Sequence, residues 1–368
     1  MKKIYKKVLD EVIPYKPGKP IEEVKREIGL DEVIKLASNE NPFSPSEKVL
    51  KAIAENISEV NRYPDGGCFY LRKALSEKLS ISGENIVFGN GSDEVIILTL
   101  RAFLSPGDEV VISDPTFMVY KIASKIEGAE LKVAPAKEFK HDLEGVLSCV
   151  TDKTKIIFIA NPENPTGSYI RAKELDEFIE KLPEDVVLFM DEAYYEFASG
   201  GDYPETLSMI EKTDRNIIIA RTFSKVYGLA GLRIGYALAR EDIAELLNKV
   251  REPFNVNSLA QVAAVAALKD DEYVKKNVDW VKKEKQRFYD FFESVGFEYV
   301  PSRTNFILFD TARNSTELFN KLLYKGVIVR DMTAWGIKGF LRVNIGTEEE
   351  NNKFISALQE VIKGMLEK

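Results

Sequence analysis

The sequence predicts an α/β fold with a largely parallel sheet, followed by a smaller α+β domain. From Ile86 to Ala239, short apolar runs alternate with amphipathic segments, which is the pattern of strands joined by helices. The runs contain mainly β-branched and aromatic residues, as expected of strands covered on both faces. After Arg251 the pattern changes to a long helical periodicity and then to further short strands. We therefore expect a large domain joined to a smaller one by a connecting helix.

The bulk properties are those of a globular protein and exclude several classes of function. A chain of 368 residues, 45% hydrophobic and 30% charged, is longer than one ordinary core requires. Its net charge of −8 argues against nucleic-acid binding. Cys68 and Cys149 have no metal-ligand spacing and predict neither a disulfide framework nor a metal site. No apolar run approaches the roughly 20 residues of a membrane span, and Asp10 and Glu11 interrupt any signal-peptide core, so we expect a cytoplasmic protein.

The first helix of the large domain is expected to begin at Ser44. Pro45 would lie in its first turn, and Glu47 would complete a capping box with Ser44. Pro64 should end the helix near Tyr63. Its predicted apolar face comprises Val49, Ile53, Ile57 and Val60.

The strands and the second domain follow in order. Candidate strands are Ile86–Phe88, Glu109–Ser113, Lys155–Ala160, Val186–Met190, Asn216–Ala220 and Arg233–Ala239. A long helix with apolar residues from Val274 to Val295 should end at Gly296. Strands at 304–310, 327–332 and 340–346 and a final helix, capped by Thr347 with Glu350, should complete the smaller domain. We expect an N-terminal arm (1–40) packing on the small domain and a dimer partner, a large domain (41–253), and connecting helices with a small domain (254–368).

Two polar clusters follow the first and third of these strands. The segment from Gly89 to Glu94 combines glycines with a helix start, where free amides can bind an anion. It lacks the third glycine of a dinucleotide-binding fingerprint, which argues against a nicotinamide cofactor. The segment from Asn161 to Gly167 holds a loop rigid with two prolines and can direct Asn164 at a ligand. Taken alone, each cluster is also compatible with an ordinary turn.

Two further clusters follow the next two strands. Asp191 ends an apolar run, so it should be buried and needs a cationic partner, while Tyr194 can face the same crevice. Thr222, Ser224 and Lys225 follow the next run, with an arginine eight residues after the lysine. Taken alone, Lys225 would be a surface lysine.

The coincidence of all four clusters favours a cofactor site over four separate turns. The carboxyl ends of parallel strands meet at one edge of the sheet, where ligands bind in open α/β folds. An anion-binding helix terminus, a buried carboxylate, a phenol, an amide and a lysine would meet there. Pyridoxal phosphate (PLP) requires this set, because it needs a lysine for its aldehyde and an acid at its ring nitrogen.

The single histidine removes several other mechanisms. One histidine excludes a histidine-rich metal site, and a Ser-His-Asp triad would depend on His141 alone. Because His141 lies in a polar stretch, from Lys137 to Asp142, we expect it to be an exposed loop residue. Lysine is then the leading nucleophile.

The cluster motifs also carry a family resemblance. The strings Asn164-Pro165-Thr166-Gly167, Asp191-Glu192-Ala193-Tyr194 and Ser224-Lys225 with Arg233 are collinear over nearly the whole chain, which resembles the fold-type-I aminotransferases of class I/II. This resemblance implies a mostly parallel, seven-stranded sheet between helices. It implies that Lys225 carries PLP as a Schiff base, that Asp191 pairs with the ring nitrogen, and that these two residues and Tyr194 are catalytic.

The same resemblance assigns the remaining cofactor contacts. Asn164 and Tyr194 would hydrogen-bond the 3-oxygen of the ring, and Phe117 would stack on the ring face. A homodimer is implied, because Tyr63 would reach the phosphate bound by the neighbouring subunit. The other phosphate contacts would be Ser92, Asp93, Thr222, Ser224 and Arg233.

Motifs outside the cofactor clusters bear on the substrate. The strings 14–20, 38–42, 62–65 and 329–331 resemble those of the histidinol-phosphate aminotransferase family. That resemblance implies transamination between L-histidinol phosphate and 2-oxoglutarate, giving imidazole acetol phosphate and glutamate, a step of histidine biosynthesis. Arg342 would bind the substrate anion, Arg330 with Tyr15 would add a second cation for the phosphate, and Asn164 would complete the substrate contacts. An aromatic amino acid aminotransferase and a threonine-phosphate decarboxylase are alternatives on the same scaffold.

Overall fold

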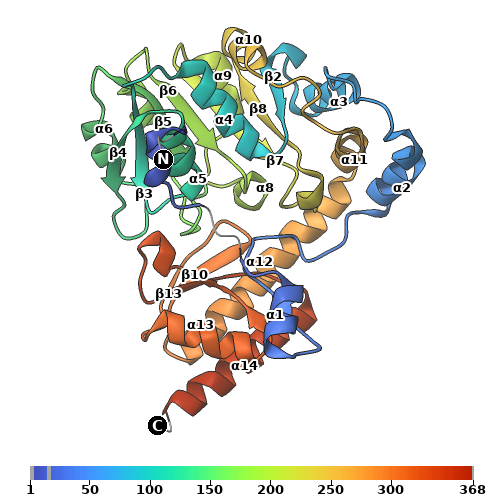
Figure 1. Ribbon diagram of the computed structural model, residues 1–368, viewed down its shortest axis with the longest axis vertical. Coiled ribbons are helices and arrows are strands. Elements are labelled where there is room, and N and C mark those ends of the chain that lie inside the picture. The colour runs from blue at the N-terminus through green and yellow to red at the C-terminus, as the bar shows by residue number, and fades with distance from the viewer. Residues whose placement is uncertain (1–3, 15–17, 367–368) are drawn as a thin grey trace.

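The computed structural model describes residues 4–14 and 18–366 and has two lobes, each built on its own sheet (Figure 1). The upper lobe in Figure 1 carries a seven-stranded sheet in the order β2-β8-β7-β6-β5-β3-β4. The lower lobe carries a four-stranded sheet in the order β12-β13-β10-β9. The sequence predicted both the larger, mostly parallel sheet and the smaller α+β unit.

The large sheet is parallel except for one strand. Its strands are β2 (Ile86–Gly89), β3 (Glu109–Asp114), β4 (Glu130–Pro135), β5 (Thr154–Ala160), β6 (Val187–Asp191), β7 (Asn216–Thr222) and β8 (Gly235–Ala239). Strand β8 runs antiparallel to both of its neighbours, so its first residues lie beside the last residues of β2 and β7. The sequence did not predict β4, because this edge strand alternates charged and apolar residues and is largely exposed.

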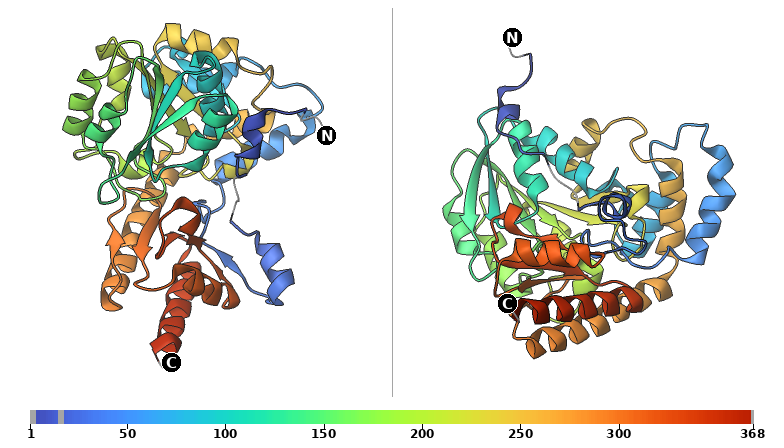
Figure 2. Two further views of the ribbon diagram at one scale, coloured as in Figure 1. Left: turned by 60° about the vertical axis from the view of Figure 1, so that its left-hand side comes forward. Right: turned by 60° about the horizontal axis from the view of Figure 1, so that its bottom comes forward.

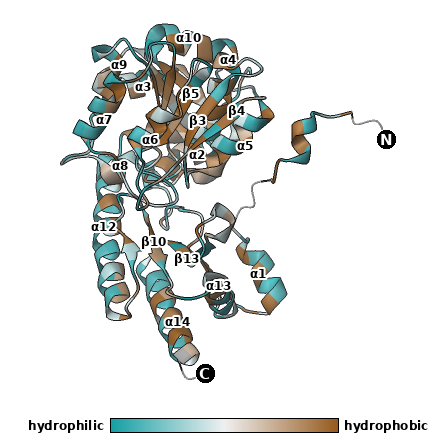
Figure 3. Cartoon of the chain, turned by 90° about the vertical axis from the view of Figure 1, so that its left-hand side faces the viewer, coloured by the Kyte–Doolittle hydropathy of each residue, from teal (hydrophilic) through white to brown (hydrophobic). Residues whose placement is uncertain are grey.

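Two hydrophobic cores cover the two faces of the large sheet. Successive residues of β5 point to opposite sides, so that Ile157 packs in one core and Phe158 in the other. Figure 3 shows hydrophobic residues gathering in the strands between the helix layers. One core is covered by α4 (Ser92–Phe103), α5 (Met118–Ile126) and α10 (Glu241–Lys249). The other is covered by α2 (Glu47–Asn56), α3 (Phe69–Leu79), α6 (Leu143–Ser148), α7 (Ala172–Glu180) and α11 (Ser258–Leu268).

The predicted helix at Ser44 begins later and ends earlier than expected. Helix α2 starts at Glu47, and its N-cap is Ser46, whose side chain accepts from the Val49 amide at 3.4 Å. The Ser44 carbonyl instead accepts from the Tyr273 hydroxyl at 2.9 Å. After Asn56 the chain continues as a short 3-10 turn, η2 (Ile57–Glu59), so the predicted apolar face is not continued. Ile57 and Val60 are each 57% exposed as a result.

The lower lobe follows the predicted order. Helix α12 (Asp271–Ser294) crosses from the upper to the lower lobe, and Gly296 follows it with a φ of +73° (Figure 1). The predicted capping box is present, because Thr347 and Glu350 exchange hydrogen bonds of 2.8 and 3.2 Å. The other elements are β9 (Tyr299–Val300), β10 (Phe306–Asp310), α13 (Ser315–Tyr324), β11 (Val327–Ile328), β12 (Arg330–Asp331), β13 (Phe340–Asn344) and α14 (Glu348–Leu366).

The N-terminal segment joins both lobes. Strand β1 (Ile34–Lys35) pairs in parallel with β11, and α1 (Ile21–Ile28) packs beside it. The residues before α1 reach the upper lobe, where Lys6 donates to the Ile126 carbonyl at 2.9 Å (Figure 2). Two short helices, α8 (Tyr195–Ala198) and α9 (Met209–Lys212), complete the set of α-helices in the described chain. None of the helices in the described part of the chain combines the length and the apolar character that a membrane crossing needs.

Candidate active site

A cavity of about 470 Å³ lies at the edge where the strands of the large sheet end. The N-terminal segment contributes Gly18, Ser38, Asn39 and Glu40 to its wall. The cavity therefore receives side chains from both lobes. The predicted site residues that line it are Ser92, Asp93, Phe117, Asn164, Asp191, Tyr194, Thr222, Ser224, Lys225, Arg233 and Arg342.

One end of the cavity is shaped for an anion. Helix α4 begins there, at Ser92, so the backbone amides of its first turn point toward the cavity edge. The Thr222 hydroxyl donates to the Ser224 hydroxyl at 3.0 Å, and the Arg233 guanidinium contacts Asp93 at 3.1 Å. Gly91 caps the helix with a φ of +82°, and a Cβ at this position would clash with the Arg233 guanidinium. Hydroxyls, amides and a guanidinium are the donors that hold a phosphate group.

Asp191 lies at the floor of the cavity, at the end of β6. Its carboxylate accepts from the Tyr120 hydroxyl at 2.6 Å and from the Ala193 amide at 3.0 Å. The side chain is buried, and burial raises the pKa of the carboxyl group to about 6. We predicted a cationic partner, but within the described chain no cation lies at ion-pair distance from Asp191. Two neutral hydrogen-bond donors contact the carboxylate instead of a cation, so a cation bound beside it would stabilise its charged form.

Lys225, Tyr194 and Asn164 surround the middle of the cavity. The Lys225 amine lies 5.6 Å from the centre of the Tyr194 ring. The Tyr194 hydroxyl accepts from the Asn39 amide at 2.8 Å, and burial raises its pKa to about 12. The Asn164 carbonyl oxygen accepts from Arg342 at 2.5 Å, which ties the loop after β5 to strand β13 of the lower lobe. Arg342 is 5% exposed and donates also to the Ala37 carbonyl.

Two predicted residues that the structure describes, Arg330 and Tyr63, do not line the cavity. Arg330 lies opposite Arg342 in the register of β12 and β13, and its guanidinium covers the Trp335 ring at 4.5 Å. The Arg330 guanidinium lies close to Gly18, which lines the cavity. A Cβ atom added to Gly18 would lie 3.8 Å from Nη1 of Arg330. Tyr63 is 83% exposed and stacks on Phe254 outside the cavity. Tyr15 lies outside the described residues.

Sequence reasoning missed Tyr120 and the true environment of His141. Tyr120 is fully buried and donates to Asp191; its position three residues after Phe117, one helical turn along, was the available signal. His141 was expected to be exposed, but only 2% of its side chain is. Lys137 and Asp142 form an ion pair at 2.6 Å at the surface, so the polar stretch faces outward while the imidazole turns inward.

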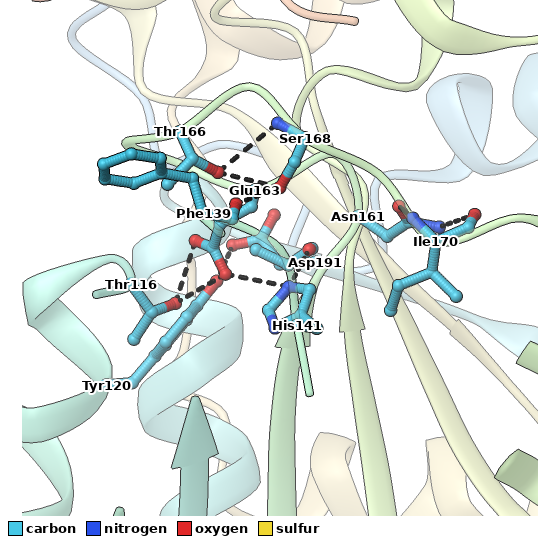
Figure 4. A network of polar contacts seen from close by, with 11 residues as sticks. Thr116, Tyr120, Phe139, His141, Asn161, Glu163, Thr166, Ser168, Ile170 and Asp191 are labelled. Carbon is cyan, nitrogen blue, oxygen red and sulfur yellow. Dashed lines mark hydrogen bonds and ion pairs between the residues drawn. The ribbon is translucent and has the colours of Figure 1, made fainter. Parts of the chain in front are cut away.

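His141 belongs to a buried network behind the cavity wall (Figure 4). Its Nε2 atom lies 2.8 Å from the Ala160 carbonyl oxygen and 2.9 Å from the Glu163 carboxylate. The same carboxylate accepts from the Thr116 hydroxyl at 2.9 Å. Burial works against the charge, but the Glu163 carboxylate and the Ala160 carbonyl together raise the pKa of His141.

Comparison with known proteins identifies the class to which this site belongs. Residues 31–358 match the family described as aminotransferase class I and II, and the chain belongs to this family. Its fold is the fold-type-I aminotransferase fold that the sequence predicted. Similar proteins include the histidinol-phosphate aminotransferases of Moorella thermoacetica, 47% identical over 95% of this chain and 90% of that protein, and of Brevibacillus brevis, 48% identical over 96% of each. A crystal structure of histidinol-phosphate aminotransferase from Sinorhizobium meliloti in complex with pyridoxal-5'-phosphate matches with a TM-score of 0.90 at 30% identity, covering 98% of both chains.

Proposed function

We propose that this chain is a PLP-dependent histidinol-phosphate aminotransferase. It would convert L-histidinol phosphate and 2-oxoglutarate into imidazole acetol phosphate and glutamate, a step of histidine biosynthesis. The observation that carries the proposal is one cavity in which a lysine, a buried acid without a cation and an anion-binding helix terminus face one another. The similarity to histidinol-phosphate aminotransferases along nearly the whole chain supports the choice of substrate.

The donor set of the cavity fits PLP. A protonated ring nitrogen is the cation that Asp191 lacks, and the Lys225 amine is the group that bonds to the aldehyde. Phe117 would lie against the ring, and Asn164 and Tyr194 would hydrogen-bond its 3-oxygen. Tyr63 of the partner subunit would reach the same phosphate. The remaining phosphate contacts would be Arg233, the hydroxyls of Thr222 and Ser224, and the α4 terminus at Ser92 and Asp93.

The residues of this chain then perform the proton transfers. Bound PLP withdraws electrons from the α-carbon of the amine substrate, which makes its proton acidic. Lys225 would be the general base that takes this proton from the substrate carbon, and the general acid that returns it to the carbon of the former aldehyde group. Asp191 would keep the ring nitrogen protonated, because the positively charged nitrogen would stabilise the charged form of this buried carboxylate. Tyr194 holds the 3-oxygen and so keeps the ring in place.

Two neighbouring arginines support the choice of substrate. Arg342 is buried beside the cavity, and a guanidinium binds a carboxylate with two hydrogen bonds, which suits glutamate. Histidinol phosphate has no carboxylate but ends in a phosphate, which needs more positive charge. Arg330 stands opposite Arg342 in adjacent strands, so both side chains lie on the same face of the sheet. We assign the second cation to Arg330, assisted by Tyr15.

We further propose a cytoplasmic homodimer with three structural regions. Exposed aromatic residues around Tyr63 support a dimer interface, and two free cysteines suit a reducing compartment. We assign residues 41–253 to the cofactor domain and residues 254–368 to the connecting helices and small domain. Residues 1–40 form the arm, and the pairing of β1 with β11 supports its packing on the small domain.

The decisive experiment is a half-reaction on the PLP-loaded protein. Histidinol phosphate, added without a keto acid, should bleach the visible cofactor band at concentrations where phenylalanine does not. Bleaching by phenylalanine or tyrosine alone would contradict the substrate. Release of carbon dioxide from added threonine phosphate would favour a decarboxylase, and a protein that takes up no PLP would contradict the whole proposal. Lys225→Ala should lose the band and nearly all turnover.

The same assay tests the two arginines. Arg330→Ala should raise KM for histidinol phosphate about tenfold or more and leave KM for glutamate nearly unchanged, because a hydrogen bond to a charged group contributes roughly 1.5–3 kcal/mol. Arg342→Ala should raise KM for both substrates. Equal losses for both substrates in Arg330→Ala would contradict its assignment to the phosphate.

A further inference from the structure

The buried network of His141, Glu163 and Thr116 has no part in the chemistry described above, yet it touches the cofactor site on two sides. Glu163 precedes Asn164, and Thr116 precedes Phe117; both of these neighbours line the cavity. His141 comes from a third segment, between β4 and α6, and its ring also contacts the end of β5 at Ala160 (Figure 4). One carboxylate therefore joins three separate segments directly behind the cavity wall.

A network of this kind is a poor way to gain stability. The Glu163 and His141 side chains are only 3% and 2% exposed, and Thr116 is 1% exposed. Taking such polar groups out of water offsets most of what their attraction contributes, and apolar residues of similar size often stabilise a core equally well. Polar groups define direction and distance better than apolar ones do, so a buried polar network is suited to fixing a geometry.

The geometry that this network fixes is the spacing of two cofactor contacts. The Glu163 backbone is itself held, because its amide donates to the Ser168 carbonyl and its carbonyl accepts from the Gly167 amide, both at 2.8 Å. Its carboxylate then reaches Thr116 with distances of 2.9 and 3.1 Å to the two oxygens. The loop with Asn164 and the loop with Phe117 are thus connected through one rigid contact, and Asn164 continues this connection to Arg342 at 2.5 Å.

We propose that His141, Glu163 and Thr116 form a positioning unit that holds the Phe117 loop and the Asn164 loop at the separation the cofactor ring requires. This inference rests on the proposed function, since it takes PLP as the ligand of the cavity. His141 orients the Glu163 carboxylate, Glu163 holds the Thr116 hydroxyl, and Thr116 fixes the backbone before Phe117. None of the three lines the cavity.

The test compares Thr116→Val with Thr116→Ser, because valine matches threonine in shape while serine keeps the hydroxyl. Thr116→Val should weaken PLP binding about tenfold. This is the lower end of the loss of affinity seen at metal sites when a residue that orients a ligating side chain is mutated. It should also change the visible circular dichroism of bound PLP, which reports on the asymmetric surroundings of the ring. Thr116→Ser should restore both. Glu163→Gln should resemble Thr116→Val, with kcat falling more than KM rises.

Glu284→Gln provides a matched control in the lower lobe. Glu284 is also a buried carboxylate, with Asn351 at 2.9 Å and Arg287 at 3.2 Å, and neither it nor these partners line the cavity. This variant should melt at a lower temperature while its PLP affinity stays within twofold of the parent protein. If Thr116→Val and Glu163→Gln lower the melting temperature but leave PLP affinity and the dichroism unchanged, the network only supports the fold and the proposal is wrong. If the parent protein binds no PLP, the proposed function itself fails instead.

Discussion

At the scale of one residue, Asp191 shows how a group in a binding site can lower the stability of the cofactor-free protein. Within residues 4–14 and 18–366, its neighbours supply only two neutral hydrogen bonds, and burial raises the pKa of its carboxyl group from 3.8 to about 6. A group whose pKa is higher in the folded than in the unfolded protein favours folding only at low pH. Above pH 6 the charged carboxylate therefore destabilises the cofactor-free protein, and this penalty is relieved when a cation binds.

We therefore expect Asp191→Asn to stabilise the cofactor-free protein while it abolishes transamination. A shift from 3.8 to about 6 corresponds to about 3 kcal/mol at pH 7.5, and the gain should fall to about half of that at pH 5, where the unfolded carboxylate is still charged but the folded one is largely protonated. Urea unfolding at the two pH values measures the difference. A variant that is less stable than its parent at pH 7.5 would contradict the argument.

The sequence was informative about residues at the ends of apolar strands and uninformative about their neighbours. Asp191 was recognisable because five apolar residues, Val186–Met190, lead directly into an acid. Tyr120 reaches Asp191 from another element, and His141 turns inward because its charged neighbours pair with each other. Both placements depend on how separate segments pack, which local polarity does not encode.

At the scale of elements, the reversed strand β8 brings the arginine of the phosphate site into place. Because β8 is antiparallel, the residues before it lie at the same sheet edge as the residues after β2, β6 and β7. Between β7 and β8 the helical structure consists of the short 3-10 turn η5 (Ala230–Leu232), whereas the parallel strands β5 and β6 are joined through the α-helix α7. The missing helical pattern between these two strands was the signal in the sequence for the direction of β8, which we did not predict.

The α4 terminus gives a prediction that separates backbone strain from cofactor binding. Gly91→Ala and Gly107→Ala both place a side chain at positive φ, +82° and +93°, so each should lower stability by about 1–3 kcal/mol. A Cβ at Gly107 meets no atom within 4 Å, whereas one at Gly91 displaces the Arg233 guanidinium. Titration with PLP should thus show affinity lost about tenfold or more in Gly91→Ala only. An equal loss in both variants would attribute it to strain alone.

At the scale of the whole molecule, several large apolar side chains gather on one exposed surface. An apolar patch on this surface comprises Val60, Tyr63, Phe69, Tyr70 and Phe254, each between 47% and 83% exposed. A cavity of about 600 Å³ opens beside the patch, between α2 and α11. Large exposed apolar patches generally mark interfaces. The patch includes Tyr63, which we expect to reach the cofactor of the neighbouring subunit. We therefore propose that a second copy of the chain covers the patch.

Charge on this patch should separate the subunits. The protein should sediment with twice the 41.6 kDa mass of the chain, and Tyr70→Glu should shift it to the monomer, because a carboxylate buried at an interface is costly to desolvate. Tyr324→Glu is the matched control, since Tyr324 is 69% exposed, close to the 77% of Tyr70, but lies on the lower lobe. Analytical ultracentrifugation distinguishes the three. A parent protein that sediments as a monomer, or a dimer that persists in Tyr70→Glu, would contradict this interface.

The pairing of β1 with β11 has a consequence for the order in which the newly made chain folds. Ile34 leaves the ribosome long before its partner Val327, which lies 293 positions later in the sequence. The seven-stranded sheet closes with β8, at Ala239, so it can form during translation while the N-terminal segment still has no strand to pair with. Ser38, Asn39 and Glu40 follow that segment and line the cavity. The wall of the active site is therefore completed only after Val327 has emerged, so a chain that stops before β11 cannot assemble it.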